Sequence, residues 1–330
     1  MHYDYETCER LYREQFSTMS LTEDGLRYLM VRTLIDHETL RASPALRQWL
    51  QIGAQRWDIQ MIWNLRRQVF TDSSIPLSDL NNLLRSVYRE TFVMRGWNIR
   101  RIARSLKSVS KQGDEYWKAW NRVFRDDIRA HIQHRFVRSP SIQTHEELLS
   151  RIDADLNPVI TGYTVISWYN QWSSALTEHI VLSHPRVVPA ARRIDKVDFF
   201  LDDLPVDLKI TFVPQGYIKS LRLGRIPVSS AVMNQIRKHP LSLAQWLYEN
   251  QGTSRFSDSH RIFVMLADEE RLEDSWKLKS EFSHIKKAVN RFLSEPAPLR
   301  PLSWRFHSRT ISGSFTTYTG VMVVTREKYR

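Results

Sequence analysis

Two short segments with strand-like alternation, residues 194–201 and 206–213, constrain the fold of this chain more than any other feature. Residues 202–205, with the sequence DDLP, separate them and are typical of a tight turn. Because side chains alternate between the two faces of a strand, Asp207, Lys209 and Thr211 share one face of the second segment. Its apolar residues share the other face. We therefore expect a hairpin that carries charged side chains on one surface.

The first strand adds a second carboxylate to that surface. Asp198 points away from its neighbours Val197 and Phe199, so it can lie near Asp207 and Lys209 if the strands pair. Mg²⁺ is commonly held by one or two carboxylates together with waters and substrate phosphates. A lysine beside such an ion can orient the attacking water and offset phosphate charge. Asp195 competes with Asp198 for the role of first acid, although the alternation favours Asp198.

The surrounding segments predict an α+β or α/β fold. A helical pattern occupies residues 162–183, and a further strand signal follows at 186–188. After the hairpin come a helical stretch broken at Pro240, a buried-strand candidate at 261–268 and an amphipathic helix over 273–293. The tail from Leu302 alternates like a closing hairpin. Helices and strands in this order indicate a sheet with helices packed against it.

The N-terminal part of the chain has helical periodicity throughout. Helical patterns cover residues 43–70 and 114–136, and another helix begins near Pro76 or Ser78. Residues 137–147 contain Pro and Ser and are the candidate linker. We therefore predict an all-helical, basic domain over 1–140, used for target recognition or dimer contacts, and a second domain over 141–330.

The motif VDFFLDDLPVDLK resembles that of the PD-(D/E)XK nuclease superfamily, whose fold is shared by many restriction endonucleases. The resemblance covers about residues 162–268, and Val197 stands where the family name has proline. It implies a restriction-endonuclease-like mixed sheet flanked by helices, with Asp198 and Asp207 as metal-binding acids and Lys209 as the catalytic lysine. It further implies that Glu178, on the preceding helix, completes the acidic cluster and that the carbonyl of Leu208 is a further ligand. The implied cofactor is Mg²⁺, for which Mn²⁺ can substitute, and the implied product carries a 5′-phosphate.

The charge balance indicates a polyanionic partner. The chain has a formal net charge of +12, which favours nucleic acid over a membrane surface. The stretch after the lysine strand contributes three candidate phosphate contacts, Lys219, Arg222 and Arg225. A basic helix contributes three more, Arg100, Arg104 and Lys107, for which a solvated face is an equally good interpretation.

These patterns favour a Mg²⁺-dependent DNA endonuclease of the restriction or phage-defence type, with DNA preferred over RNA as partner and a possible homodimer. One alternative is a non-catalytic nucleic-acid-binding module on a nuclease-like scaffold. Another is an RNA-cleaving toxin that uses Arg129 and His134 of the segment RAHIQH. The single cysteine, Cys8, excludes an intrachain disulfide and favours a reducing compartment. With no apolar run long enough to span a bilayer, we expect a cytoplasmic protein without a membrane partner.

Overall fold

The computed structural model describes residues 2–123, 128–222, 229–250, 258–307 and 312–326. The chain forms two compact units. Unit 1 comprises residues 1–97, 178–275 and 283–330, and unit 2 comprises residues 98–177 and 276–282. The predicted boundary at residue 140 therefore lies inside unit 2, and the first 97 residues belong to the same unit as the sheet.

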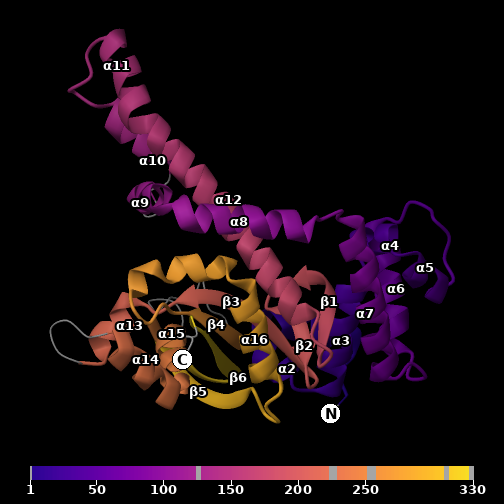
Figure 1. Cartoon of the computed structure of the whole chain (residues 1–330). Coiled ribbons are helices and arrows are strands. Elements are labelled where there is room, and N and C mark those ends of the chain that lie inside the picture. The colour runs from indigo at the N-terminus through magenta and orange to yellow at the C-terminus, as the bar shows by residue number, and fades with distance from the viewer. Residues whose placement is uncertain (1, 124–127, 223–228, 251–257, 308–311, 327–330) are drawn as a thin grey trace. The chain divides into compact units, whose positions relative to one another are not determined.

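Unit 1 is built on a six-stranded mixed sheet, so the predicted α+β class is confirmed. The strands follow the order β1-β2-β3-β4-β6-β5 across the sheet (Figure 1). β1–β2–β3 is an antiparallel meander, β3, β4 and β6 run parallel, and β5 pairs with β6 antiparallel. Their bounds are β1 Val187–Ile194, β2 Val197–Leu201, β3 Leu204–Phe212, β4 His260–Leu266, β5 Arg300–His307 and β6 Ser312–Val324.

The predicted hairpin is formed by β2 and β3. Phe199 pairs with Val206, and the turn consists of Asp202 and Asp203. Both turn residues have positive φ angles, of 50° and 60°. A two-residue turn of this kind follows the right-handed twist of the flanking strands, which explains why the strands pair in this register.

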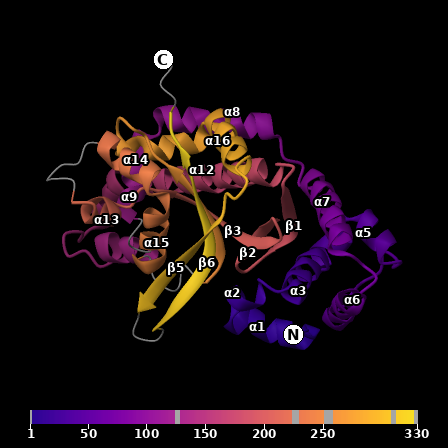
Figure 2. The ribbon, with the colours of Figure 1, turned by 90° about the horizontal axis from the view of Figure 1, so that it is seen from below.

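The N-terminal helices of unit 1 pack against the β1 end of the sheet. Their apolar stripes form a common core with Val188 and Ala191 of β1 and with Phe200 of β2. α3 and α7 contact β1 directly, and Figure 2 shows them beside that strand. These helices are α1 Tyr5–Glu14, α2 Phe16–Met19, α3 Glu23–Leu34, α4 His37–Ala42, α5 Pro44–Trp49, α6 Ile59–Thr71 and α7 Leu77–Met94.

The predicted helix over 43–70 is two helices in the structure. Ser43 caps α5 by accepting a hydrogen bond from the Leu46 amide, and Pro44 occupies the first turn, as the sequence indicates. α5 ends at Trp49, and the chain is irregular until the Asp58 carboxylate caps α6. The apolar spacing continues across this break, which is why periodicity alone does not reveal it.

A second core lies toward the other end of the sheet. Helices α14 and α15 pack their apolar faces on Phe263 and Met265 of β4 and on Leu302 and Trp304 of β5. Pro240 begins α15, so the predicted break falls between these two helices. The remaining helices of unit 1 are α13 Gln215–Ser220, α14 Ser229–Lys238, α15 Pro240–Asn250 and α16 Phe282–Leu293.

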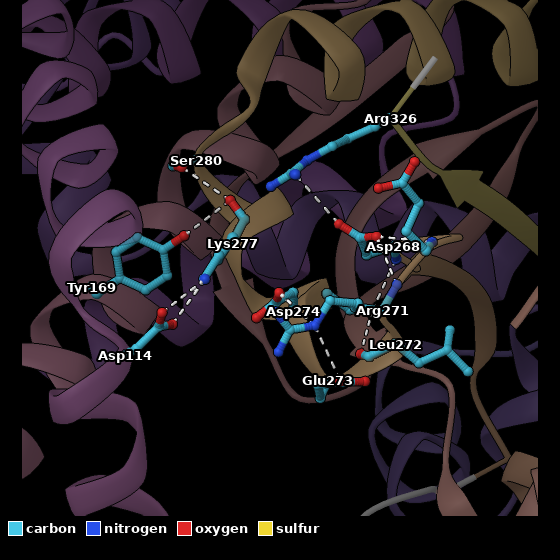
Figure 3. Close-up of polar contacts among 12 residues, drawn as sticks. Asp114, Tyr169, Asp268, Arg271, Leu272, Glu273, Asp274, Lys277, Ser280 and Arg326 are labelled. Atoms are coloured by element: carbon cyan, nitrogen blue, oxygen red, sulfur yellow. Dashed lines mark hydrogen bonds and ion pairs between the residues drawn. The ribbon is translucent and has the colours of Figure 1, made fainter. Parts of the chain in front are cut away.

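Unit 2 is helical. Trp117 stacks between Trp120 and Trp276 at ring-centroid distances of 5.0 Å, so these three rings pack together within the unit. Lys277 joins its segment to this unit through an ion pair with Asp114 (Figure 3). Its elements are α8 Ile99–Gln112, α9 Asp114–Val123, α10 Ile128–Ile132, the π-helices Gln133–Val137 and Ile152–Leu156, α11 His145–Arg151, most of α12 Asn157–Leu182 and part of the 3-10 helix Leu272–Ser280.

In the described part of the chain, no helix combines the length and the apolar character needed to cross a membrane.

Candidate active site

Asp207 and Lys209 lie on the same face of β3, as the sequence predicts. The Lys209 Nζ atom lies 2.9 Å from Oδ1 of Asp207, which confirms the alternation predicted for this segment. Phe199 pairs with Val206, and continuing that register by one residue brings Asp198 opposite Asp207. Asp207 is buried, whereas the Lys209 side chain is 42% exposed. The ammonium group of Lys209 can therefore meet a ligand in solution while the carboxylate anchors it.

Asp207 is also held by the neighbouring strand. Residues Asp207 and Arg261 are direct partners in the parallel β3–β4 register. The Arg261 Nε atom donates to Oδ2 of Asp207 over 2.7 Å, and both side chains are buried. The two carboxylate oxygens thus contact two different cations. This arrangement fixes the position of the carboxylate.

Asp198 lies where two carboxylates approach each other. Its Oδ2 atom accepts a hydrogen bond of 2.8 Å from the backbone amide of Leu208. Burial of its side chain raises the pKa of Asp198, and the nearby charge of Asp207 raises that pKa further. The Leu208 hydrogen bond and the charges of Arg193 and Lys209 act in the opposite direction. A divalent cation between the two carboxylates would relieve their repulsion.

Glu178, on α12, is linked to Asp198 by Arg193 of β1, which contacts both carboxylates. Both carboxylate oxygens of Glu178 contact the Arg193 guanidinium, whose Nε lies 2.9 Å from Oε1. The same Nε lies 3.5 Å from Oδ1 of Asp198. Arg193 therefore bridges two of the predicted acids, and its own side chain is 64% exposed.

The competing first acid occupies a different position. Asp195 lies in the turn between β1 and β2, where its side chain is exposed. Its backbone carbonyl accepts a hydrogen bond of 2.7 Å from the Tyr12 hydroxyl. Asp198, by contrast, is on β2 beside Leu208 and within the field of Asp207 and Lys209.

The donor set of the site suits a hard cation in part. Among the described residues, no group of three or more His, Cys, Asp and Glu side chains is arranged to hold a metal ion. Two neighbouring carboxylates, Asp198 and Asp207, nevertheless match what Mg²⁺ takes from proteins, since waters and substrate phosphates complete its shell. Glu178 would join them only after Arg193 releases it. Leu208, whose carbonyl is a predicted ligand, lies between Asp207 and Lys209 in β3.

The predicted phosphate contacts are distributed over both units. Lys219 is exposed on α13, so this part of the predicted basic loop is helical. Arg222 is exposed just after it with a φ of 51°, and Arg225 lies outside the described residues. Arg100, Arg104 and Lys107 are exposed on α8 of unit 2, as the helical spacing predicts. Lys107 has an acidic neighbour that is distant in sequence, the Glu281 carboxylate at 3.5 Å.

Two arginines of the site, Arg193 and Arg261, were not predicted from the sequence. Arg193 precedes the hairpin in the segment ARRID. The only local signal for a role is that two consecutive arginines stand next to the acid-bearing strand. Arg261 opens the apolar segment RIFVMLAD, where nothing local marks it as the partner of Asp207. Both contacts depend on strand pairings, and Arg261 meets Asp207 across 54 residues.

Comparisons of the chain with protein-family models, curated proteins and solved structures gave no match.

Proposed function

We propose that this protein is a metal-dependent nuclease that hydrolyses phosphodiester bonds. The observation that carries the proposal is the gathering of Asp198, Asp207 and Lys209 on one surface of the β2–β3 hairpin. Two carboxylates and an exposed ammonium group are what a phosphodiester needs for metal binding and charge neutralisation. The meander, the crossover helices and the parallel β4 are also compatible with the restriction-endonuclease-like arrangement that the motif resembles.

In this proposal each residue has a distinct role. Asp198 and Asp207 would hold Mg²⁺, which when bound polarises the phosphodiester and lowers the pKa of a bound water. Lys209, which projects toward solvent beside Asp207, would orient the attacking water and neutralise a phosphate oxygen. Arg261 is a positioning residue because it fixes Asp207 from the neighbouring strand.

Arg193 compensates part of the acidic charge of the site. Its single guanidinium contacts both Glu178 and Asp198. One guanidinium does not neutralise two carboxylates, so the acids keep negative charge that would attract a divalent ion. Glu178, if released from Arg193, would be a further carboxylate for that ion or its waters.

DNA is the proposed substrate, and a restriction or phage-defence role is the proposed setting. The net charge of +12 supports a nucleic-acid partner. The preference for DNA over RNA, the possible homodimer and the setting rest on the resemblance of the motif alone.

A non-catalytic nucleic-acid-binding module is the second candidate, and one observation favours it. Each of the three predicted acids already contacts a cation: Glu178 and Asp198 contact Arg193, and Asp207 contacts Lys209 and Arg261. A fully paired network of this kind can also serve only to order the sheet.

The two candidates are separated by incubating the purified protein with supercoiled plasmid, linear duplex DNA and single-stranded RNA, each with Mg²⁺ or with EDTA. The nuclease predicts nicking or cutting of DNA that requires Mg²⁺ and leaves 5′-phosphate ends. The Asp198→Asn variant should bind DNA and lose cleavage. Its matched control, Asp203→Asn, removes an exposed carboxylate of the same hairpin and should cut at the wild-type rate. Binding of DNA without any Mg²⁺-dependent cleavage would favour the non-catalytic module.

A further inference from the structure

A basic pocket of about 370 Å³ adjoins the candidate site within unit 1. Four arginines line it, Arg32 from α3, Arg66 from α6, and Arg192 and Arg193 from β1. Arg193 is shared with the candidate site, because its guanidinium also contacts Glu178 and Asp198. Arg193 therefore belongs both to the pocket wall and to the candidate site.

The lining of the pocket carries four arginines and two carboxylates, Asp36 and Asp195. Arg32 is neutralised by Glu9, whose Oε2 lies 2.6 Å from its Nη1. Asp36, a buried carboxylate of the pocket wall, serves two arginines at once. It contacts Arg192 directly, and Arg66 Nη2 lies 4.0 Å from its Oδ2.

Arg66 has the most distant carboxylate partner of the four arginines. Its side chain is 18% exposed, and its Nε donates to the carbonyl of Ile35 over 2.7 Å. Burial lowers the pKa of Arg66, and the nearby charge of Arg32 also lowers it. A guanidinium that is desolvated, close to a like charge and only distantly paired gains from an anion in the pocket.

The strand geometry brings two adjacent arginines to the same pocket. Side chains of neighbouring residues normally point to opposite faces of a strand. The β1–β2 register shifts between Pro189 and Ile194, which is the signature of a β-bulge. Arg192 and Arg193 lie within this interval, and both line the pocket. Bulges commonly re-aim side chains next to functional sites.

From these contacts we propose that the pocket binds a phosphate group of the nucleic-acid strand next to the bond that Asp198, Asp207 and Lys209 address. The proposal rests on the proposed function. Planar guanidinium groups bind phosphate oxygens in pairs, which suits Arg66 and Arg192 on the pocket wall. Arg193 also lines the pocket, so its guanidinium would be a further contact for this phosphate.

Binding in EDTA tests the proposal without cleavage. The probe is a 20-base-pair DNA duplex labelled with fluorescein at one end, titrated by fluorescence anisotropy at several salt concentrations. Arg192→Gln should weaken binding about tenfold, as expected for the loss of one charge-assisted contact. The slope of log K against log salt should fall by about 0.9. Arg192→Lys, which keeps the charge and loses the planar fork, should weaken binding by about threefold.

The matched control is Arg237→Gln in the same unit. Arg237 is 50% exposed and paired with Glu269, much as Arg192 is 46% exposed and paired with Asp36. The control should change the affinity by less than about twofold, as expected for an exposed charge away from the contact. Circular dichroism of each variant verifies that the fold is retained.

Equal affinities of Arg192→Gln and Arg237→Gln would overturn the proposal, and if Mg²⁺-dependent cleavage is present the proposed function would still stand. Reduced binding by Arg192→Gln in a protein that never cleaves would support the phosphate pocket and reject the nuclease. Binding of inorganic phosphate, measured by calorimetry, without binding of the duplex would also overturn the proposal, because the ligand would then be a free anion.

Discussion

At the scale of single residues, the two acids of the site differ in how well their buried charges are compensated. Asp207 tolerates burial because Lys209 and Arg261 contact its two oxygens at 2.9 and 2.7 Å. Asp198 has weaker compensation, because Arg193 is 3.5 Å away and the amide of Leu208 is its close donor. Burial, followed by the nearby charge of Asp207, raises the pKa of Asp198 despite these contacts. The two acids therefore respond differently to removal.

Neutralising Asp198 should stabilise the fold. A carboxyl group whose pKa is raised in the folded state binds its proton more tightly there than in the unfolded chain. Its contribution to stability is therefore lost as the pH rises above the ordinary value of 3.8. Asp198→Asn, which can still accept from the Leu208 amide, should raise Tm near neutral pH and change it little at pH 4. Thermal unfolding of both proteins across this range tests the sign. A lower Tm for the variant at neutral pH would mean that Asp198 stabilises the sheet as an ion-pair partner.

Removing Asp207 should have the opposite effect. Asp207→Ala takes the close carboxylate away from Arg261, whose side chain is 3% exposed, and should cost about 3 kcal/mol of unfolding free energy. Lys209→Ala breaks a partly exposed pair and should cost about 1 kcal/mol or less. Urea titration of the two variants measures this difference. Equal losses would show that the Arg261 pair does not carry the burial cost of Asp207.

At the scale of elements, the β2–β3 turn positions the acids. The alternation of the two strands and the DDLP turn were sufficient to predict this hairpin, because both are local in sequence. Arg261 and Arg193 were not predictable in the same way. Arg261 reaches Asp207 only through parallel pairing of β3 with β4, and Arg193 depends on the irregular register of β1.

The turn provides a test of the hairpin geometry. Asp203 has a φ of 60°, a conformation that glycine adopts without strain. Asp203→Gly should therefore stabilise the protein by about 0.5 kcal/mol. Asp202→Gly relieves the same strain but removes the carboxylate that Arg186 contacts at 2.8 Å, so it should be neutral or destabilising. Chemical unfolding of both variants decides, and a loss of stability in Asp203→Gly would contradict the turn described here.

At the scale of the whole molecule, the boundaries of the two units do not fall where the local composition of the sequence suggests. The Pro- and Ser-containing segment at 137–147 suggested a boundary, yet it lies within unit 2. The apolar stripes of the helices in residues 1–97 indicate which side chains are buried, but not the element against which they pack. In the structure that partner includes β1 and β2 of the sheet. Long-range packing of this kind leaves no periodic signal in the sequence.

The basic helix of unit 2 carries a prediction about binding. If Arg100, Arg104 and Lys107 contact phosphates, replacing all three by Gln should reduce the slope of log K against log salt by about 2 to 3. The matched control replaces Lys118, Arg138 and Arg151 by Gln, three exposed cations of the same unit. Fluorescence anisotropy with duplex DNA measures both slopes. Equal slopes for the two triple variants would mean that α8 is a solvated basic face.

The most direct test of the candidate active site is the rate at which Lys209→Ala cleaves plasmid DNA at saturating Mg²⁺. We expect this rate to fall at least about a hundredfold, because a positioned charge next to the reacting phosphate is lost. Lys238→Ala, which removes an exposed lysine of α14, should cleave at the wild-type rate. Cleavage by Lys209→Ala at the wild-type rate, with the same requirement for Mg²⁺, would show that catalysis takes place elsewhere in the protein.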